Sequence, residues 1–321
     1  MEIKSRSRRL RGSEGLRSLM SETKLSAGEL VAPIFVRYGK GIVEPIASMP
    51  GINRYSADKV GDYVSALAEI GIKSVLLFGI PRHKDRLGTA AYSDEGIIPK
   101  AVSAIKDAVP STVVMADVCL CEYTDHGHCG VIRGTGVDND MTLPLLSKAA
   151  VAYARAGADV VAPSAMMDGQ VAAIRGGLDA AGYKDTVIMG YSAKYASEFY
   201  GPFRSAAGST PQFGNRKAYQ MDPANAREAM KEIELDIKEG ADIVMIKPAL
   251  AYLDVISEAR RRFNVPIAAY NVSGEYAMLK SAAANGWIDG DKAALEVLLS
   301  IKRAGADLII TYHAETIARQ L

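Results

Sequence analysis

Short runs of apolar, mostly β-branched residues alternate with amphipathic segments along most of the chain. The runs lack the polar–apolar alternation of a strand with one wet face, which is typical of parallel strands that are covered on both sides. Eight such runs are predicted to be strands, at residues 30–36, 74–78, 112–118, 159–162, 186–190, 243–246, 266–270 and 308–311.

The segments between the runs carry apolar residues at helical spacing. Three of these predicted helices have a clear apolar face, formed by Val60, Val64 and Leu67, by Met230, Ile233 and Ile237, and by Leu295, Leu298 and Ile301. Asp222-Pro223 predicts the start of the second helix, because aspartate is a good N-cap and proline suits the first turn.

A glycine-containing joint recurs where a helical pattern gives way to a strand pattern. Gly-Ala-Asp occupies residues 157–159, 240–242 and 305–307, and Gly71-Ile72-Lys73 stands at the same place in another repeat. Glycine suits the left-handed backbone that commonly ends a helix. Each joint therefore marks the passage from a helix into the next parallel strand.

Eight strands alternating with helices predict an α/β fold of the TIM (β/α)8-barrel type. An open doubly wound sheet is the alternative, but no Gly-x-Gly-x-x-Gly follows the first strand, which disfavours the nucleotide-binding form of that fold. With 321 residues the chain can form one barrel of about 250 residues with additions. We expect the barrel domain to span residues 29–321.

Two segments are poor in both patterns. Residues 1–28 precede the first strand and are predicted to form an extended N-terminal arm that contains an arginine-rich stretch. Residues 197–221 are rich in Gly, Ser, Pro and aromatic residues and follow a strand, so they would lie on the barrel face where active sites occur. A structureless stretch of this length is usually a lid or a linker, and its position favours a lid.

Charge and hydropathy argue against several kinds of partner. The 38 Lys and Arg residues balance 37 Asp and Glu residues, so no global field would attract nucleic acid or an anionic membrane. No apolar run reaches the roughly 18 residues of a spanning helix, and the first residues show no signal-peptide core. We therefore expect a cytoplasmic protein without nucleic-acid or membrane partners.

The three cysteines, Cys119, Cys121 and Cys129, all lie within eleven residues. An odd, clustered set disfavours a disulfide scaffold. Cys119 and Cys121 would point to one side of an extended strand end, and nearby glycines would let Cys129 turn back toward them. Three thiolates suit Zn²⁺ and leave a fourth position open, with His126 and His128 as further possible ligands. Buried free cysteines and a redox-sensing thiol remain alternatives.

Two lysines, Lys194 and Lys247, follow strongly apolar runs at predicted strand ends. Most lysines are solvated surface charges, but here the ammonium would be partly desolvated, and a second cation nearby would lower its pKa further. A neutral amine is what forms a Schiff base with a carbonyl substrate. One such lysine is typical of a class I aldolase. Two indicate an enzyme with two carbonyl substrates, or one nucleophile and one lysine that tunes it.

Further polar side chains lie at strand ends or in the predicted lid. Each alone would more often be structural, but their shared place at one barrel face indicates a site, and arginines in a lid typically clamp carboxylate or phosphate. They are Asp117, Ser164, Ser273 and Tyr312 near strand ends, and Arg204, Arg216 and Gln220 in the predicted lid.

Seven stretches share one resemblance: DVCLCEYTDHGHCG, APSAMMDG, YSAKYASEFYGPFRSAAGS, NRKAYQMDPAN, MIKPALAYLD, AAYNVSGEYAML and the arginine-rich arm. Together they resemble the zinc-dependent porphobilinogen synthases (5-aminolevulinate dehydratases), and the similarity covers essentially the whole chain. The resemblance implies the condensation of two 5-aminolevulinate molecules into porphobilinogen, with loss of two waters, for tetrapyrrole (heme-type) biosynthesis.

The resemblance also implies roles for individual residues. Lys194 would form a Schiff base with the first substrate and Lys247 with the second, and zinc would be bound by Cys119, Cys121 and Cys129. The matching motifs assign the substrate contacts as follows: Arg204, Gln220 and the adjacent Arg216 to one carboxylate, Ser273 and Tyr312 to the other, and Asp117 and Ser164 to the amino group of the first substrate.

Assembly is the last property that the resemblance implies. Family members form homo-octamers in which arms embrace adjacent barrels, and Glu232 matches the position of an allosteric magnesium ligand. Glu232 lies off the apolar face of its predicted helix, so its side chain should point outward; a plain solvated acid is the alternative.

Two rival hypotheses remain from the residues themselves. A class I Schiff-base aldolase would share the barrel and one lysine, but it has no need of a thiolate cluster. A zinc- or redox-sensing barrel protein would explain the cysteines, but not the strand-end lysines or the arginines of the predicted lid.

Overall fold

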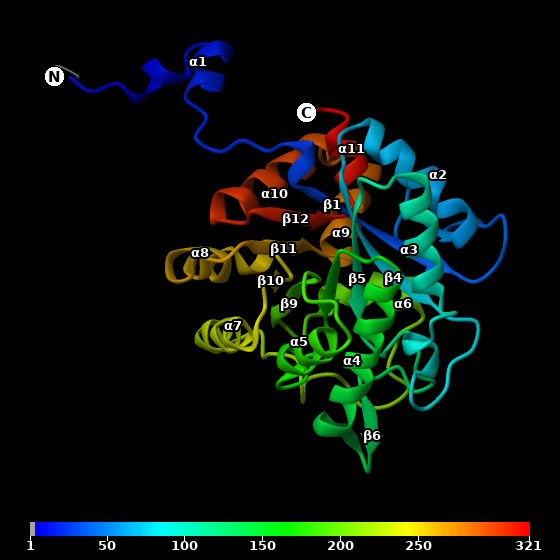
Figure 1. Cartoon of the computed structure of the whole chain (residues 1–321). Helices are drawn as coiled ribbons and strands as arrows, with labels where there is room; N and C mark the ends of the chain where they lie inside the picture. Colours follow the sequence, from blue (N-terminus) through cyan, green and yellow to red (C-terminus); the bar gives the residue numbers. More distant parts are fainter. Residues whose placement is uncertain (1–3) are drawn as a thin grey trace.

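A parallel barrel forms the centre of the computed structural model, which describes residues 4–321; the first three residues of the predicted arm lie outside this range. Its strands are β1 (Leu30–Arg37), β4 (Ser74–Ile80), β5 (Val113–Val118), β8 (Val160–Pro163), β9 (Val187–Lys194), β10 (Ile243–Lys247), β11 (Ile267–Asn271) and β12 (Leu308–Thr311). They pair in this order, and β12 pairs with β1 to close the barrel (Figure 1). The predicted (β/α)8 barrel is confirmed, and the open sheet is wrong.

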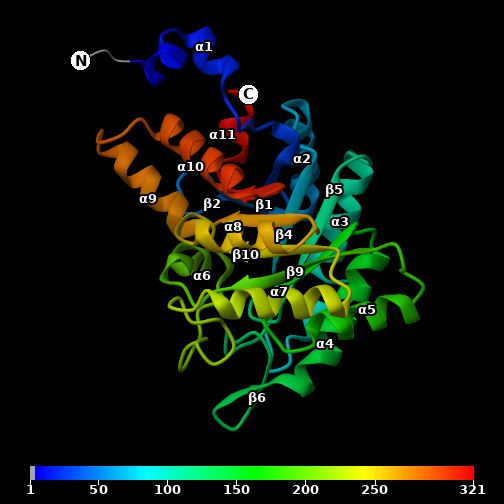
Figure 2. The same cartoon turned by 90° about the vertical axis from the view of Figure 1, so that its left-hand side faces the viewer.

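Helices surround the barrel on the outside (Figures 1 and 2). The longer ones are α2 (Ala57–Glu69), α3 (Ile97–Ala108), α4 (Asn139–Arg155), α5 (Gln170–Ala180), α7 (Arg227–Glu239), α8 (Leu253–Arg262), α9 (Ser273–Ala284) and α10 (Gly290–Ala304). The predicted apolar faces pack inward, since Val64, Ile233 and Leu298 are buried. One apolar cluster fills the space between strands and helices, and a second fills the inside of the barrel.

Short elements complete the chain. They are β2 (Val43–Pro45) and β3 (Asn53–Ser56), the hairpin β6 (Val131–Arg133) with β7 (Gly136–Asp138), α11 (Ala314–Ala318), and the 3-10 turns η2 (Ala27–Glu29), η3 (Thr89–Tyr92) and η5 (Leu250–Tyr252). No helix within residues 4–321 is both long and apolar enough to cross a bilayer.

The recurring glycine joints adopt the backbone that the sequence predicts. Gly157, Gly240 and Gly305 have φ angles of 102°, 105° and 127°, and each stands just past the end of a helix. A side chain at such positions is strained, so glycine lets each helix end and the chain enter the next strand.

Helix α7 begins later than Asp222-Pro223 predicts, so that prediction is wrong. Asp222 caps a turn instead, because its side chain accepts from the backbone N of Ala224 at 2.9 Å. The helix starts at Arg227, where Asn225 Nδ2 donates to Glu228 Oε2 at 3.0 Å.

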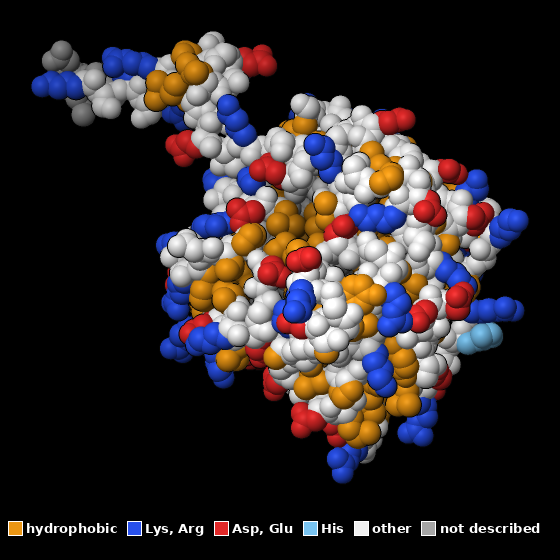
Figure 3. Space-filling model, in the orientation of Figure 1, with side chains coloured by type: hydrophobic (Ala, Val, Ile, Leu, Met, Phe, Trp, Pro, Cys, Tyr) orange, Lys and Arg blue, Asp and Glu red, His pale blue; other side chains and the backbone are white. Residues whose placement is uncertain are grey.

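The arm projects away from the barrel (Figures 1 and 2). It contains η1 (Ser7–Arg11) and α1 (Glu14–Leu19), and neither has a buried residue. The hydroxyl of Ser13 caps α1 by accepting from Leu16 N at 3.2 Å. Apolar side chains of the arm are therefore exposed (orange in Figure 3): Leu10, Leu16, Leu19 and Met20.

The predicted lid is not structureless throughout. Its first part forms η4 (Glu198–Tyr200) and α6 (Gly201–Ala207), with Pro202 in the first turn of α6. Gly208, with φ of 58°, ends the helix, and the chain then continues irregularly until Met221 pairs with Tyr195 next to the end of β9.

Candidate active site

The two strand-end lysines lie side by side. Lys194 is the last residue of β9, Lys247 is the last residue of β10, and the two are paired in the register of these neighbouring strands. Both side chains are only 5% exposed and line one small cavity. Because parallel strands of a barrel end at one face, the position of each lysine after its apolar run is what brings the two amines together.

Lys247 stands in a cage of aromatic rings. Its Nζ lies 4.2 Å from the ring centre of Tyr270, 5.0 Å from that of Tyr191, and 5.3 Å from those of Tyr200 and Phe203. Burial lowers the pKa of Lys247 to about 7, and the charge of Lys194 contributes in the same direction. Ring faces attract a cation, but the loss of water outweighs this attraction. A large fraction of Lys247 is therefore a neutral, nucleophilic amine near neutral pH.

Lys194 belongs to a polar chain with Ser164 and Asp117. Its Nζ donates to the backbone oxygen of Ser164 at 2.5 Å, and the Ser164 hydroxyl donates to Asp117 Oδ2 at 3.0 Å. Burial and, to a smaller extent, the charge of Glu122 raise the pKa of Asp117 to about 7. Asp117 can thus take up or release a proton close to neutral pH.

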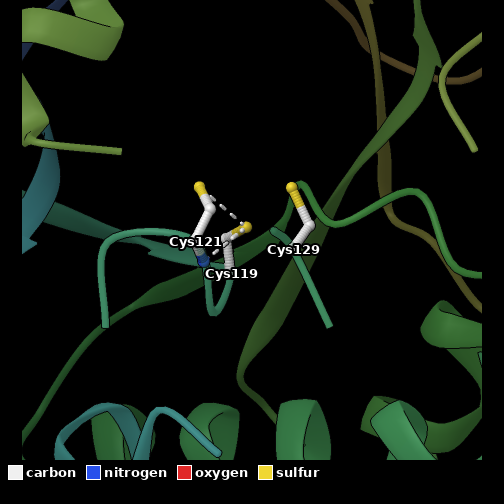
Figure 4. Close-up of side chains that lie close together, drawn as sticks. All are labelled: Cys119, Cys121 and Cys129. Carbon is white, nitrogen blue, oxygen red and sulfur yellow. Dashed lines mark hydrogen bonds between the residues drawn. The ribbon is translucent and has the colours of Figure 1, made fainter. Parts of the chain in front are cut away.

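The three cysteines converge at the end of β5 (Figure 4). Their sulfur atoms all lie within 4.8 Å of one another, and Cys119 Sγ is 3.3 Å from Cys121 Sγ. Burial raises the pKa of Cys119, and the hydrogen bond between the Cys119 and Cys121 thiols raises that of Cys121. The same thiols hold the pKa of Cys129 well below its usual value by donating to it. This donor set fits a metal ion that prefers thiolates.

The two histidines of the cysteine loop are engaged elsewhere. Both ring nitrogens of His128 have partners, since Nδ1 lies 3.1 Å from the Tyr219 hydroxyl and Nε2 lies 2.9 Å from the Phe213 oxygen. The His126 ring lies 3.3 Å from the backbone oxygen of Arg86. The structure therefore groups the cysteines without the histidines that the sequence also offered.

Glu122 is a site residue that the sequence reasoning missed. Its carboxylate is buried, lines the lysine cavity, and lies 3.2 Å from Cys121 Sγ. The acid directly after Cys121 in CLCEYT was a visible signal, but neighbouring residues of an extended segment usually point to opposite sides.

The predicted lid packs against the cysteine loop. Arg216 donates to the backbone oxygens of Gly127 at 2.9 Å and Ser209 at 2.6 Å, and Gln212 N donates to the oxygen of His126 at 3.0 Å. With the contacts of His128, these bonds join the two segments into one packed unit. A movement of the cysteine loop would therefore disturb the hydrogen bonds that hold the predicted lid.

Several buried polar atoms around the lysines have no partner within residues 4–321. They are Asp117 Oδ1, Arg204 Nε, Arg216 Nε, and both Gln220 Oε1 and Gln220 Nε2. Of these residues, Asp117, Arg204 and Arg216 line the lysine cavity, whereas Gln220 lines two other cavities. Buried polar groups are normally paired, so the unpaired atoms of the first three residues indicate a polar ligand in the lysine cavity. The cavity itself has a volume of only about 20 Å³, little more than one water occupies. The chamber must widen before it admits an organic molecule.

Ser273 and Tyr312 do not line this cavity, and each contacts a residue of the aromatic cage around Lys247. The Ser273 hydroxyl accepts from Phe203 N at 3.0 Å and donates to the oxygen of Phe199 at 3.3 Å. The Tyr312 hydroxyl lies 3.0 Å from that of Tyr270. Each residue therefore contacts a member of the aromatic cage around Lys247. Ser273 contacts Phe203 of the predicted lid, and Tyr312 contacts Tyr270 of β11.

Glu232 lies outside the barrel, on α7. It is half-buried, and it lines a cavity of about 480 Å³ together with Asp168, Glu228 and Asp236. Burial raises the pKa of Glu232, and the charges of Asp168 and Glu228 add to this effect. The side chain is off the apolar face of its helix, as expected, but it is less solvated than a plain surface acid.

Fold and geometry together define a (β/α)8-barrel protein whose buried chamber holds two adjacent lysines beside a cluster of three cysteines that can hold a metal. The family model described as delta-aminolevulinic acid dehydratase matches residues 4–320. A relative of that name from Synechococcus elongatus is 56% identical over 320 residues, which cover 98% of each chain. One from Archaeoglobus fulgidus is 56% identical and covers 99% of this chain and 98% of its own.

A solved structure agrees with these sequence matches. Delta-aminolevulinic acid dehydratase (porphobilinogen synthase) from Toxoplasma gondii, in complex with the reaction product porphobilinogen, matches with a TM-score of 0.96 and 44% identity over 99% of this chain and 92% of that one. The chain belongs to the delta-aminolevulinic acid dehydratase family of enzymes.

The environment of Lys247 predicts the pH dependence of its reaction with a small keto acid. Only the neutral amine attacks a carbonyl, so borohydride-trapped adduct on the Lys247 peptide should rise with pH through a midpoint near 7 and then level off. In Asp117→Asn the midpoint should move to lower pH, because the negative charge of Asp117 favours the ammonium form. A midpoint close to the ordinary lysine pKa of about 10.4 in the unchanged protein would contradict the assignment.

Proposed function

We propose that this enzyme condenses two molecules of 5-aminolevulinate into porphobilinogen with loss of two waters, and so supplies tetrapyrrole biosynthesis. One observation carries the proposal: two buried lysines lie in register on neighbouring strands of one chamber. Two amines that can each hold a ketone suit a reaction that joins two ketones. The family membership and the product held by the Toxoplasma gondii relative support the same reaction.

Each lysine would hold one substrate covalently. The neutral amine attacks the ketone carbon, water leaves, and the resulting imine makes the adjacent carbon acidic. We assign the first substrate to Lys194 and the second to Lys247. Holding both reactants side by side makes the condensation effectively intramolecular, which can contribute about 7–11 kcal/mol to lowering the barrier.

The unpaired polar atoms of the chamber would bind the rest of the substrates. We assign one carboxylate to Arg204, Arg216 and Gln220. Each has a buried side-chain nitrogen atom without a hydrogen-bond acceptor within residues 4–321. Asp117, held by the Ser164 hydroxyl, would contact the amino group of the first substrate and move a proton there.

The second carboxylate belongs to another part of the wall. We assign it to Ser273 and Tyr312, whose hydroxyls now bond to the lid backbone and to Tyr270. Their present partners would be exchanged for the carboxylate when the lid moves. The small free volume of the chamber supports such a movement of residues 197–221.

Cys119, Cys121 and Cys129 would hold zinc. Three converging thiols fit this ion, which when bound supplies a Lewis acid with one open position beside the second substrate. The cysteines must stay reduced for this role, which suits a cytoplasmic enzyme.

Turnover of 5-aminolevulinate to a pyrrole, measured with an aldehyde colour reagent, tests the proposal directly. Lys247→Arg should lose roughly a thousandfold or more of the rate, because a guanidinium stays protonated and cannot form an imine. The control Lys238→Arg, at an exposed position of α7, should keep its activity. A protein that gives no pyrrole with zinc and both lysines present would refute the proposed function.

Zinc should act in catalysis more than in folding. A chelator or Cys119→Ala should remove the activity and leave the circular dichroism nearly unchanged, because the barrel core is closed by packed strands and helices. Added zinc should restore the chelated protein but not the variant. Global unfolding on chelation would show a structural metal instead.

Assembly forms a further part of the proposal. We propose that the arm docks on a second copy within a homo-octamer, since the apolar side chains and arginines of η1 and α1 are exposed. Glu232 would bind an allosteric magnesium ion in its carboxylate-lined cavity, where a hard cation offsets the crowded negative charges.

Removal of residues 1–11 should shrink the particle in light scattering and lower the activity. Glu232→Ala should abolish any stimulation by magnesium without changing the zinc content. Glu234→Ala is the matched control, because this exposed acid on the same helix pairs with Lys238 and lies outside the cavity. Unchanged mass, or a full magnesium response in Glu232→Ala, would contradict the corresponding part.

A further inference from the structure

A chain of buried polar side chains joins the ends of β10, β11 and β12. Glu275, in the first turn of α9, is 1% exposed, and Asn271 and Thr311, the last residues of β11 and β12, are not exposed at all. None of these three residues was a candidate from the sequence, and the reaction described above does not use them.

The contacts satisfy every oxygen in this chain. Glu275 Oε1 accepts from Leu250 N at 2.9 Å, and Oε2 accepts from Asn271 Nδ2 at 2.8 Å and from Val272 N at 2.9 Å. Asn271 Oδ1 accepts from the Thr311 hydroxyl at 2.9 Å. The same Thr311 oxygen accepts from His313 N at 3.1 Å.

The backbone groups held in this way are close to assigned substrate-binding residues. Leu250 opens the turn η5 that follows Lys247, and Val272 and His313 are the chain neighbours of Ser273 and Tyr312. A glutamate in a first helical turn ordinarily satisfies only the start of its own helix. Glu275 does this through Val272 and, in addition, reaches across to the loop that follows Lys247.

Burial makes the charged form of the Glu275 carboxylate energetically unfavourable. It has no basic side chain among its hydrogen-bond partners within the described residues, and desolvation raises its pKa to about 7 although the hydrogen bonds that it accepts oppose the shift. Buried polar networks of this kind rigidify a structure when every member is satisfied.

We propose that Glu275 is a positioning residue that, through Asn271 and Thr311, fixes the spacing between Lys247 and the Ser273–Tyr312 pair, and thereby shapes the site of the second substrate. The inference rests on the proposed function, because it takes these three residues to hold the two ends of one substrate. Lys194 stands on β9, and within residues 4–321 none of the side-chain hydrogen bonds of Glu275, Asn271 and Thr311 involves a residue of that strand. Disturbing the network should therefore affect one lysine and spare the other.

Glu275→Gln is the variant that changes the hydrogen bonds of the network most specifically. It keeps the volume but replaces one acceptor oxygen by an amide donor, which must face either Leu250 N or the pair Asn271 and Val272. With 5-aminolevulinate and borohydride, the initial rate of adduct formation on the Lys247 peptide should fall roughly tenfold or more, since small misplacements of reacting groups are costly. The adduct on the Lys194 peptide should stay within about twofold, and the KM for turnover should rise while kcat falls.

Glu296→Gln, at an exposed position of α10, is the matched control and should change neither adduct. Thr311→Val removes one hydroxyl at nearly constant shape; it should repeat the selective loss and decides the matter if Glu275→Gln does not fold. Equal loss at both lysines, or no loss at Lys247 in a folded variant, would overturn the inference. An unchanged protein that forms no adduct at either lysine would instead refute the proposed function.

Discussion

The burial of two lysine side chains at neighbouring strand ends is the constraint on which the rest of the site depends. The two lysines are in register on β9 and β10. Burial removes water from the amine of Lys247, and the positive charge of Lys194 lies nearby; together these effects bring the pKa of Lys247 to about 7. A barrel satisfies this requirement because its parallel strands end at one face while packed layers on both sides of the strands carry the stability. The unpaired polar atoms of Asp117, Arg204 and Arg216 belong to residues that line the same cavity, which suits a polar ligand.

The cysteine loop and the predicted lid are packed together, and this joins two segments that the sequence presents separately. His128 contacts both Tyr219 and Phe213, and Arg216 contacts Gly127, so residues beside the cysteines support the segment that carries Arg204, Arg216 and Gln220. Opening the chamber must disturb these bonds or move both segments together. The position of the predicted lid and the geometry of the cysteine cluster are therefore coupled in this fold.

Much of this architecture could be predicted from the sequence, because it rests on periodicity and on strand ends. The eight strands and the convergence of Lys194 with Lys247 follow from apolar runs and glycine joints. The sequence failed where local structure differs from the pattern that was expected. Asp222 caps a turn two residues long and not α7, and part of the predicted lid forms the helix α6. The network of Glu275 could not be predicted either, since its partners lie on three different strand-end loops.

The central claim is that both lysines of one chamber react with substrate in the same chain. The most direct measurement is the intact mass of the protein after borohydride reduction in the presence of 5-aminolevulinate, with a chelator present to stop turnover. The structure predicts a species with two substrate-derived increments per chain, and a single increment for Lys194→Met and for Lys247→Met. A mass that never exceeds one increment, with the same lysine modified at every substrate concentration, would contradict the two-lysine chamber as the basis of the reaction.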